Sequence, residues 1–189
     1  MAVFGTDSRS EHPLDWQLMQ DSFVSLFRED DFLAATTSWL GEHGYQVVTF
    51  DAGSRVDEAD LHRDFAGQLG FPDYYGGNPG ALDDCLWGVA AGDYGLDPNA
   101  AGLVLVIERY DLFAAHHLRP ATILLDIFAT EARSAALYGH RMMCLVRTDL
   151  PESQFPPLGA TRARGPIWPP GFPTKAARAA VGGSAAHPE

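Results

Sequence analysis

Residues 61–88 read LHRDFAGQLGFPDYYGGNPGALDDCLWG, a pattern that predicts two helices joined by a loop rich in tyrosine and glycine. The first helix is expected from Glu58 to Leu69, and Gly70 is expected to end it. Its apolar side chains recur at a spacing of four residues, at Leu61, Phe65 and Leu69. Acids crowd its first turn, where the helix dipole favours negative charge. These features predict an amphipathic helix packed on a core.

The second helix begins after Asn78, which can cap it, and Pro79 suits its first position. At about 100° per residue, one side of this helix is apolar and comprises Leu82, Cys85, Leu86 and Val89. The opposite side comprises Gly80, Asp84, Trp87 and Gly88, with Asp83 beside them. An exposed tryptophan beside carboxylates indicates a contact surface. The alternative is that a terminal segment of the chain covers Trp87.

The segments around this helix pair predict a sheet. Strands are expected at residues 22–28, 45–52, 102–108 and 141–147. Helices are expected at residues 30–43, at 120–138 and, as a short one, at 110–117. The first strand, helix and second strand form a βαβ unit, whose strands are parallel. The third strand is continuously apolar, as in strands buried on both faces of a parallel sheet. The sequence therefore predicts an α/β fold with a small parallel sheet flanked by helices.

Three regions are expected along the chain. Residues 1–44 form an N-terminal extension whose strand and helix pack on the sheet, and residues 45–149 form the main domain. The helix of the extension is capped by Asp30 or Asp31, with an apolar face of Phe32, Ala35, Trp39 and Leu40. Residues 150–189 form a tail rich in Pro, Gly and Ala. It is either disordered or laid across the body, with Trp168 and Phe172 as anchors.

The charge of the chain is strongly acidic and uneven. Its 189 residues hold 13 Lys and Arg against 25 Asp and Glu, for a net charge of −12. Within residues 57–97 there are nine acids and a single base, Arg63. Such a surface repels nucleic acid and attracts a basic partner, although acidic composition also serves solubility.

The chain lacks the patterns that carry common catalytic or metal-binding chemistry. His116 and His117 are adjacent, so in a helix they point about 100° apart and cannot chelate one ion together. Asp83 and Asp84 diverge in the same way, and Cys85 lies on the apolar side of its helix, where a thiol is inert. The GxGxxG, GxxxxGKS/T, GxSxG and CxxC motifs are absent. We therefore expect no enzymatic activity, no metal and no cofactor.

Residues 61–88 resemble the barstar family, intracellular inhibitors of secreted bacterial ribonucleases. The shared pattern is Leu-His at 61–62, Pro-x-Tyr-Tyr-Gly-x-Asn at 72–78, Ala-Leu at 81–82 and Asp-Cys-Leu at 84–86, with Gly88 behind. The resemblance extends from about Tyr45 to Arg147, because strand, helix and strand follow in the family's order. The resemblance implies a small parallel sheet flanked by helices. Residues 1–44 and the tail lie outside the part of the chain that shows the resemblance.

The resemblance also implies which residues meet the enzyme. By position, Tyr74 and Asn78 correspond to loop residues that contact the ribonuclease. Asp84 corresponds to the family's central aspartate, which occupies the phosphate site of the enzyme. Trp87 and Gly88 correspond to rim positions. The carboxylate then imitates a phosphate of RNA, while the tyrosine and the tryptophan supply rigid apolar contact.

Several positions depart from the family's pattern. Gly80 stands where the family often has an acid, and Asp83 stands where the prototype has a tryptophan. Trp87 stands where the prototype has a small residue. The family also places an acid of the later helix in the interface, and Glu131 is the nearest candidate in this chain. These departures indicate a target different from the family's best-known one, or a loss of inhibition.

We therefore expect a cytoplasmic bacterial protein, monomeric when free, that binds a basic ribonuclease and covers its active site. The alternative is a barstar-like module that binds a different basic protein, as a regulator or as immunity against another toxin. The N-terminus lacks a basic start followed by an apolar run, so no signal peptide is expected. No apolar segment approaches the roughly 20 residues that a membrane helix needs. The two cysteines, Cys85 and Cys144, lie in apolar segments and are expected to be buried free thiols.

Overall fold

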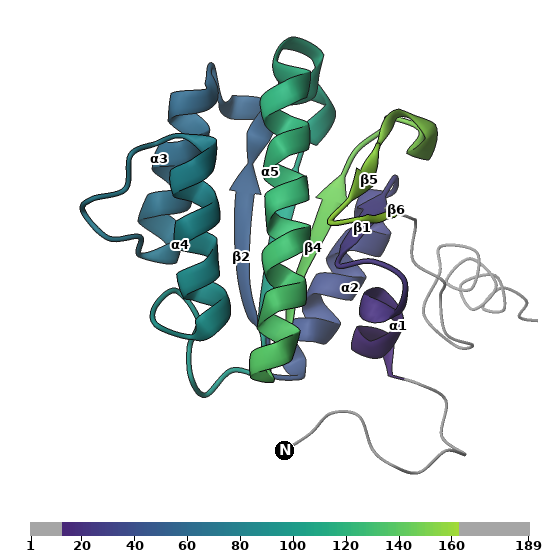
Figure 1. Ribbon diagram of the computed structural model, residues 1–189. Helices are drawn as coiled ribbons and strands as arrows, with labels where there is room; N and C mark the ends of the chain where they lie inside the picture. The colour runs from purple at the N-terminus through teal and green to yellow at the C-terminus, as the bar shows by residue number, and fades with distance from the viewer. Residues whose placement is uncertain (1–12, 163–189) are drawn as a thin grey trace, which may run out of the picture.

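The computed structural model describes residues 13–162 and contains one parallel sheet with helices on both of its faces (Figure 1). The helices are α1 (Leu14–Gln20), α2 (Asp30–Glu42), α3 (Glu58–Leu69), α4 (Pro79–Ala91) and α5 (Tyr110–Tyr138), with short 3-10 turns η1 (Ala52–Ser54) and η2 (Glu152–Gln154). The sheet strands are β1 (Val24–Phe27), β2 (Gln46–Asp51), β3 (Leu103–Glu108) and β4 (Met142–Arg147). A small hairpin follows, made of β5 (Pro157–Leu158) and β6 (Thr161–Arg162). The predicted α/β class is confirmed.

The four-stranded sheet has the order β1-β4-β3-β2, and each neighbouring pair is parallel. The expected strand at residues 22–28 therefore exists, and it runs parallel to β2 as predicted. However, β1 and β2 lie at opposite edges of the sheet and do not pair with each other. β1 pairs with β4 instead, with Val24 opposite Cys144. The N-terminal segment thus extends the sheet at the edge farthest from β2.

The core forms two layers, one on each face of the sheet. Along β3, Leu103, Leu105 and Ile107 pack with α3, α4 and α5, whereas Val104 and Val106 pack with α1 and α2. This alternation follows from the two-residue period of a strand. Figure 1 shows α4 and α5 side by side on the face toward the viewer, with α2 behind the sheet. No helix of the described residues covers the outer side of α4 in this view.

The buried face of α2 differs from the expected one. Leu33, Thr36 and Leu40 are buried, whereas Phe32, Ala35 and Trp39 are only partly buried. Thr36 is accommodated because its hydroxyl donates a 2.8 Å hydrogen bond to the Phe32 carbonyl oxygen. Glu29, rather than an aspartate, occupies the cap position, and its side chain makes no capping bond. The predicted cap is therefore wrong. The predicted face is confirmed in part, because Leu40 is buried and Phe32 and Trp39 pack against the core, but Leu33 and Thr36 take the most buried positions.

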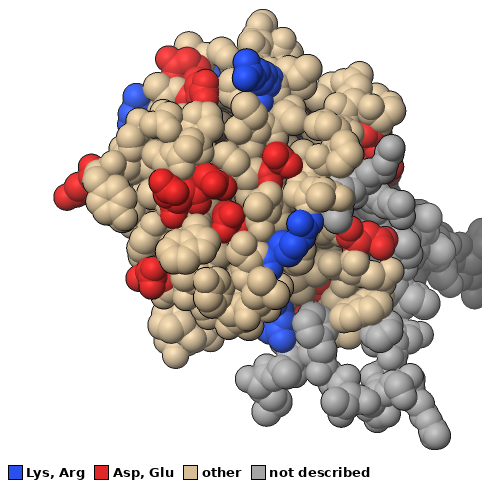
Figure 2. All heavy atoms as spheres, in the orientation of Figure 1, with Lys and Arg blue, Asp and Glu red and all other residues tan. Residues whose placement is uncertain are grey.

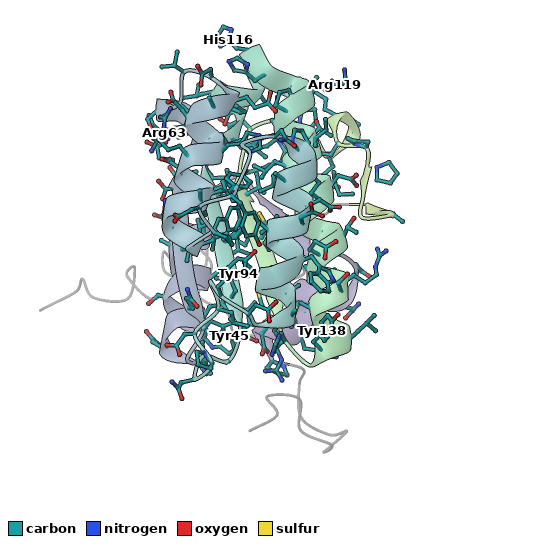
Figure 3. The ribbon with its side chains drawn as sticks, turned by 60° about the vertical axis from the view of Figure 1, so that its left-hand side comes forward. Tyr45, Arg63, Tyr94, His116, Arg119 and Tyr138 are labelled. Carbon is teal, nitrogen blue, oxygen red and sulfur yellow. The ribbon has the colours of Figure 1, made fainter. Side chains whose placement is uncertain are left out.

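The two helices expected at residues 110–117 and 120–138 form the single kinked helix α5. The backbone is non-helical at His117, and Pro120 lies inside the helix. Proline lacks an N–H and its ring clashes with the carbonyl four residues earlier, which explains the kink. Figure 3 shows His116 and Arg119 at the end of the molecule opposite Tyr45 and Tyr138.

The segments on either side of the main domain contain structure that the sequence did not indicate. Helix α1 precedes β1 and contributes buried Leu14 and Leu18 to the core. After β4, Leu158 is fully buried, and the Asp126 carboxylate accepts a 2.8 Å hydrogen bond from the Gly159 amide. Residues 157–159 of the tail therefore pack against α5. Trp168 and Phe172 lie outside the described residues.

Candidate partner-binding surface

Helix α3 positions the loop that follows it. Its start is fixed by Asp57, whose side chain accepts a 2.9 Å hydrogen bond from the Asp60 amide. Its buried side comprises Leu61, His62, Phe65 and Leu69. Gly70 ends the helix with a φ of +62°, a conformation that glycine adopts without strain. The bounds and apolar face predicted for this helix are confirmed, and the loop leaves the helix in a fixed direction.

The loop at residues 70–78 presents Tyr74 to solvent. Phe71 anchors its start, because this side chain is buried and its amide donates a 2.9 Å bond to the Ala66 carbonyl. The Tyr75 amide donates a 2.9 Å bond to the Pro72 carbonyl, which closes a turn. Tyr74 lies inside this turn, and its side chain is 79% exposed. Figure 1 shows the connection between α3 and α4 projecting from the body.

Helix α4 begins as the sequence predicts. The Asn78 side chain accepts a 3.0 Å hydrogen bond from the Ala81 amide, and Pro79 occupies the first position. The side facing the core carries the four predicted residues, Leu82, Cys85, Leu86 and Val89, all buried. Asp83 and Asp84 are exposed, and Trp87 is 50% exposed. The described chain thus leaves much of the Trp87 side chain uncovered, which favours the contact-surface interpretation.

Acidic side chains gather on the face that α4 contributes. Figure 2 shows a group of them over the part of the molecule where α4 lies in Figure 1. Within residues 13–162, no hydrogen bond or ion pair neutralises Asp83 or Asp84, whereas Asp60 and Asp64 pair with arginines. We call Tyr74, Asn78, Asp83, Asp84 and Trp87 the recognition surface. The carboxylates of Asp83 and Asp84 on this surface are exposed to solvent.

The two glycines assigned to this surface differ in their surroundings. Gly80 is exposed, and a Cβ there would meet only the Asn78 side-chain oxygen, at 3.5 Å. Gly88 is buried, because the ring of Tyr94 lies over it. The Tyr94 hydroxyl donates a 3.0 Å hydrogen bond to the Cys85 carbonyl, which holds the ring in place. The expectation that Gly88 lies on the exposed side of α4 is therefore wrong.

Glu131 of α5 is also not on the open surface. Glu131 is only 6% exposed, and its side-chain oxygen Oε2 has no hydrogen-bond partner among the described residues. Burial, and then the negative charge of Asp83, raise the pKa of the Glu131 carboxyl above its ordinary value. Glu131 therefore lies buried behind Asp83, and the expectation of an accessible acid at this position is corrected.

The geometry gives no support to nucleophilic or metal chemistry. Both cysteines are free and buried, and burial raises the pKa of each thiol, so the thiolate is disfavoured. Nε2 of His117 lies 3.0 Å from the Val56 carbonyl oxygen, so this nitrogen faces the backbone. The described residues contain no group of three or more His, Cys, Asp and Glu side chains that could hold a metal ion. Among the helices of residues 13–162, none has the length and hydropathy to cross a membrane.

Sequence reasoning missed two tyrosines that shape this surface. Tyr94 covers Gly88, and Tyr75 turns inward beside His62 while its neighbour Tyr74 turns outward. The two adjacent tyrosines were a signal only of a contact loop, since the opposite directions of their side chains depend on the turn that the Tyr75 amide closes with Pro72. No local pattern indicated Tyr94, which reaches α4 from the loop that follows it.

Comparison with known proteins agrees with this arrangement. A family model described as Barstar (barnase inhibitor) matches residues 45–147, which is more than half of the 189-residue chain. A search of curated proteins found no match. The matched residues include the whole recognition surface, both central strands and β2. The chain belongs to the barstar family.

Proposed function

We propose that this protein inhibits a ribonuclease by covering the active site of the enzyme with the recognition surface. The observation that carries the proposal is the placement of Asp84. It is exposed on the outer side of α4, beside Trp87 and Asp83, and it has no neutralising contact within residues 13–162. A ribonuclease binds the phosphates of RNA with cationic side chains, and an exposed carboxylate can occupy such a phosphate site.

The charge around Asp84 supports a basic partner. The acids of residues 57–97 outnumber the bases nine to one, and the chain as a whole carries a net charge of −12. An acidic face accelerates association with a cationic enzyme and repels RNA itself. Tyr74 and Trp87 add rigid apolar area, which is the kind of side chain that dominates binding energy at protein interfaces. The protein then acts by occlusion and needs no catalytic group of its own.

The second candidate is binding of a different basic protein, such as another toxin. Gly80 offers no carboxylate where the family often has one, and Glu131 is buried in the free protein. The recognition surface therefore rests on Asp83, Asp84 and the two aromatic side chains. This arrangement fits a cationic partner in general, and inhibition assays separate the two candidates.

The test is a titration of RNA hydrolysis by barnase and by the ribonucleases that the producing organism secretes. We expect the activity of at least one of these enzymes to fall in proportion to added protein and to vanish at a one-to-one ratio. Asp93→Ala is the matched control for Asp84→Ala, because both carboxylates are exposed but Asp93 lies beyond the end of α4. Binding of a basic protein that has no ribonuclease activity, with no effect on any ribonuclease, would support the second candidate.

A further inference from the structure

We infer that Tyr75, held by His62 and Glu58, is the residue that positions the loop at residues 70–78 for recognition. The effect on binding rests on the proposed function, whereas the effect on the loop does not. Three side chains from two segments form a continuous polar chain beneath the loop: the Glu58 carboxylate, the His62 imidazole and the Tyr75 hydroxyl.

The geometry assigns a direction to this chain. The Tyr75 hydroxyl and Nδ1 of His62 share a short hydrogen bond, and Nε2 of His62 lies 3.5 Å from Oε1 of Glu58. Burial raises the pKa of Tyr75 above its ordinary value, so the hydroxyl keeps its proton and donates it. Nδ1 is then the acceptor of this bond, and Nε2 faces the Glu58 carboxylate.

His62 is well placed to act as a fixed support. Its side chain is 6% exposed and is part of the buried side of α3. Glu58, one helical turn earlier, is the acid that faces Nε2. A buried imidazole requires partners for both of its nitrogens, and here one partner is a loop residue. The loop is therefore tied to the buried side of α3.

Tyr75 is the tether in the middle of the loop. Phe71 fixes the start, and Asn78 fixes the end by capping α4. Gly76 and Gly77 lie between Tyr75 and Asn78, so the backbone there has wide conformational freedom. The Tyr75 ring contacts Phe71 edge-on at 4.9 Å between ring centroids and lies 5.8 Å from the His62 ring.

The consequence of this tether is the outward presentation of Tyr74. The turn that exposes Tyr74 is closed by the bond from the Tyr75 amide to the Pro72 carbonyl. When the Tyr75 side chain is held, this turn is formed before a partner arrives, and the partner does not have to order it. When the side chain is released, the loop is anchored only at Phe71 and Asn78.

Hydrogen exchange of the free protein tests the tether directly. Tyr75→Phe keeps the ring but removes the hydroxyl. We expect protection of the backbone amide at position 75 to fall about tenfold, the size of one net hydrogen bond. The amides of Leu86 and Val89 in α4 should keep their protection. Tyr74→Phe is the matched control, because it removes an exposed hydroxyl from the adjacent residue and should change neither set of amides.

Two substitutions of His62 distinguish positioning from simple packing. The side-chain oxygen of His62→Asn can take the place of Nδ1, whereas His62→Gln places its amide nearer to the position of Nε2. We expect His62→Asn to keep most of the protection at position 75 and His62→Gln to lose it. Equal protection in both variants would show that the imidazole only fills space.

The same variants, titrated against barnase or another inhibited ribonuclease, measure the effect on binding. We expect Tyr75→Phe to weaken inhibition several-fold at a temperature at which both the variant and the parent are fully folded. Unchanged protection at position 75, or an equal fall across α4, would overturn the tether. Local loss of protection with full inhibition would overturn its positioning role. If the parent protein inhibits no ribonuclease, the proposed function fails, and the exchange data alone decide whether the tether exists.

Discussion

The hydroxyl of Tyr45 donates a 2.7 Å hydrogen bond to Oδ2 of Asp15, and both side chains are buried. Tyr45 is the first residue of the family match, and Asp15 belongs to α1, which lies before the match. The other carboxylate oxygen of Asp15 accepts a 2.9 Å bond from the Trp16 amide. This pair therefore fastens the N-terminal helix to the family domain.

Tyr45→Phe should lower the free energy of unfolding by about 1–3 kcal/mol, because it leaves a buried carboxylate oxygen without its partner. Urea unfolding measures this change. The double variant Tyr45→Phe/Asp15→Ala should lower the free energy of unfolding by less than the sum of the two single changes, since the residues interact directly. Strict additivity would show that the hydrogen bond contributes nothing to stability.

The Tyr45–Asp15 hydrogen bond predicts that the stability of the protein falls at alkaline pH. Burial, followed by the bond to Asp15, raises the pKa of Tyr45 well above its ordinary value. The folded pKa exceeds the unfolded one, so the stabilisation is full below pH about 10 and is lost as the pH rises further. The parent should therefore lose more stability than Tyr45→Phe between about pH 9 and about pH 11. An equal loss in both proteins would contradict this assignment.

Gly88→Ala and Gly80→Ala should have opposite effects on stability. A Cβ at Gly88 would lie 2.5 Å from the Tyr94 hydroxyl, so the Tyr94 ring must move and its bond to the Cys85 carbonyl is disturbed. We expect a loss of about 1–3 kcal/mol. At Gly80 the contact is ordinary, and alanine favours the helix by up to about 1 kcal/mol. Thermal unfolding of the two variants measures the difference, and similar midpoints would show that Tyr94 does not constrain Gly88.

Glu131→Gln should stabilise the protein more at neutral pH than in acid. The pKa of Glu131 is raised by burial and by Asp83, so its contribution to stability is full below pH about 4.3 and is lost as the pH rises through the folded pKa. Glutamine imitates the neutral acid and avoids this loss. The stability difference between variant and parent, from urea unfolding, should therefore grow between about pH 4 and about pH 7. Asp83→Asn should change stability in the same direction, and Asp93→Asn serves as the exposed control.

Local sequence signals predicted the helix pair well. As predicted, Gly70 ends α3 with a positive φ, and Asn78 caps α4 through its own side chain. Each of these signals acts within a few residues, so it can be recognised without knowledge of the fold. The exposed carboxylates and Trp87 follow from the same helical geometry, once the apolar side of α4 is known.

Features that depend on distant residues could not be predicted in this way. β1 pairs with β4, more than a hundred residues later in the chain, and nothing in either strand specifies that partner. Gly88 is buried only because Tyr94 folds back over it. Glu131 is one of the buried residues of α5, and its burial depends on how α5 packs against the other elements.

The role of Asp84 is the central claim, and the loss of affinity on its truncation tests it most directly. Asp84 lies on the exposed side of α4, so Asp84→Ala should leave the free energy of unfolding nearly unchanged. In the complex, its removal leaves cations of the phosphate site buried without a partner, which typically costs about 2–5 kcal/mol, a range to which the barnase–barstar pair itself contributes. The inhibition constant for the cognate ribonuclease should therefore rise roughly thirtyfold or more. Asp73→Ala and Asp93→Ala, as exposed charges away from the centre, should cost about 1 kcal/mol or less. An inhibition constant for Asp84→Ala no higher than those of the two control variants would contradict the phosphate-mimic account.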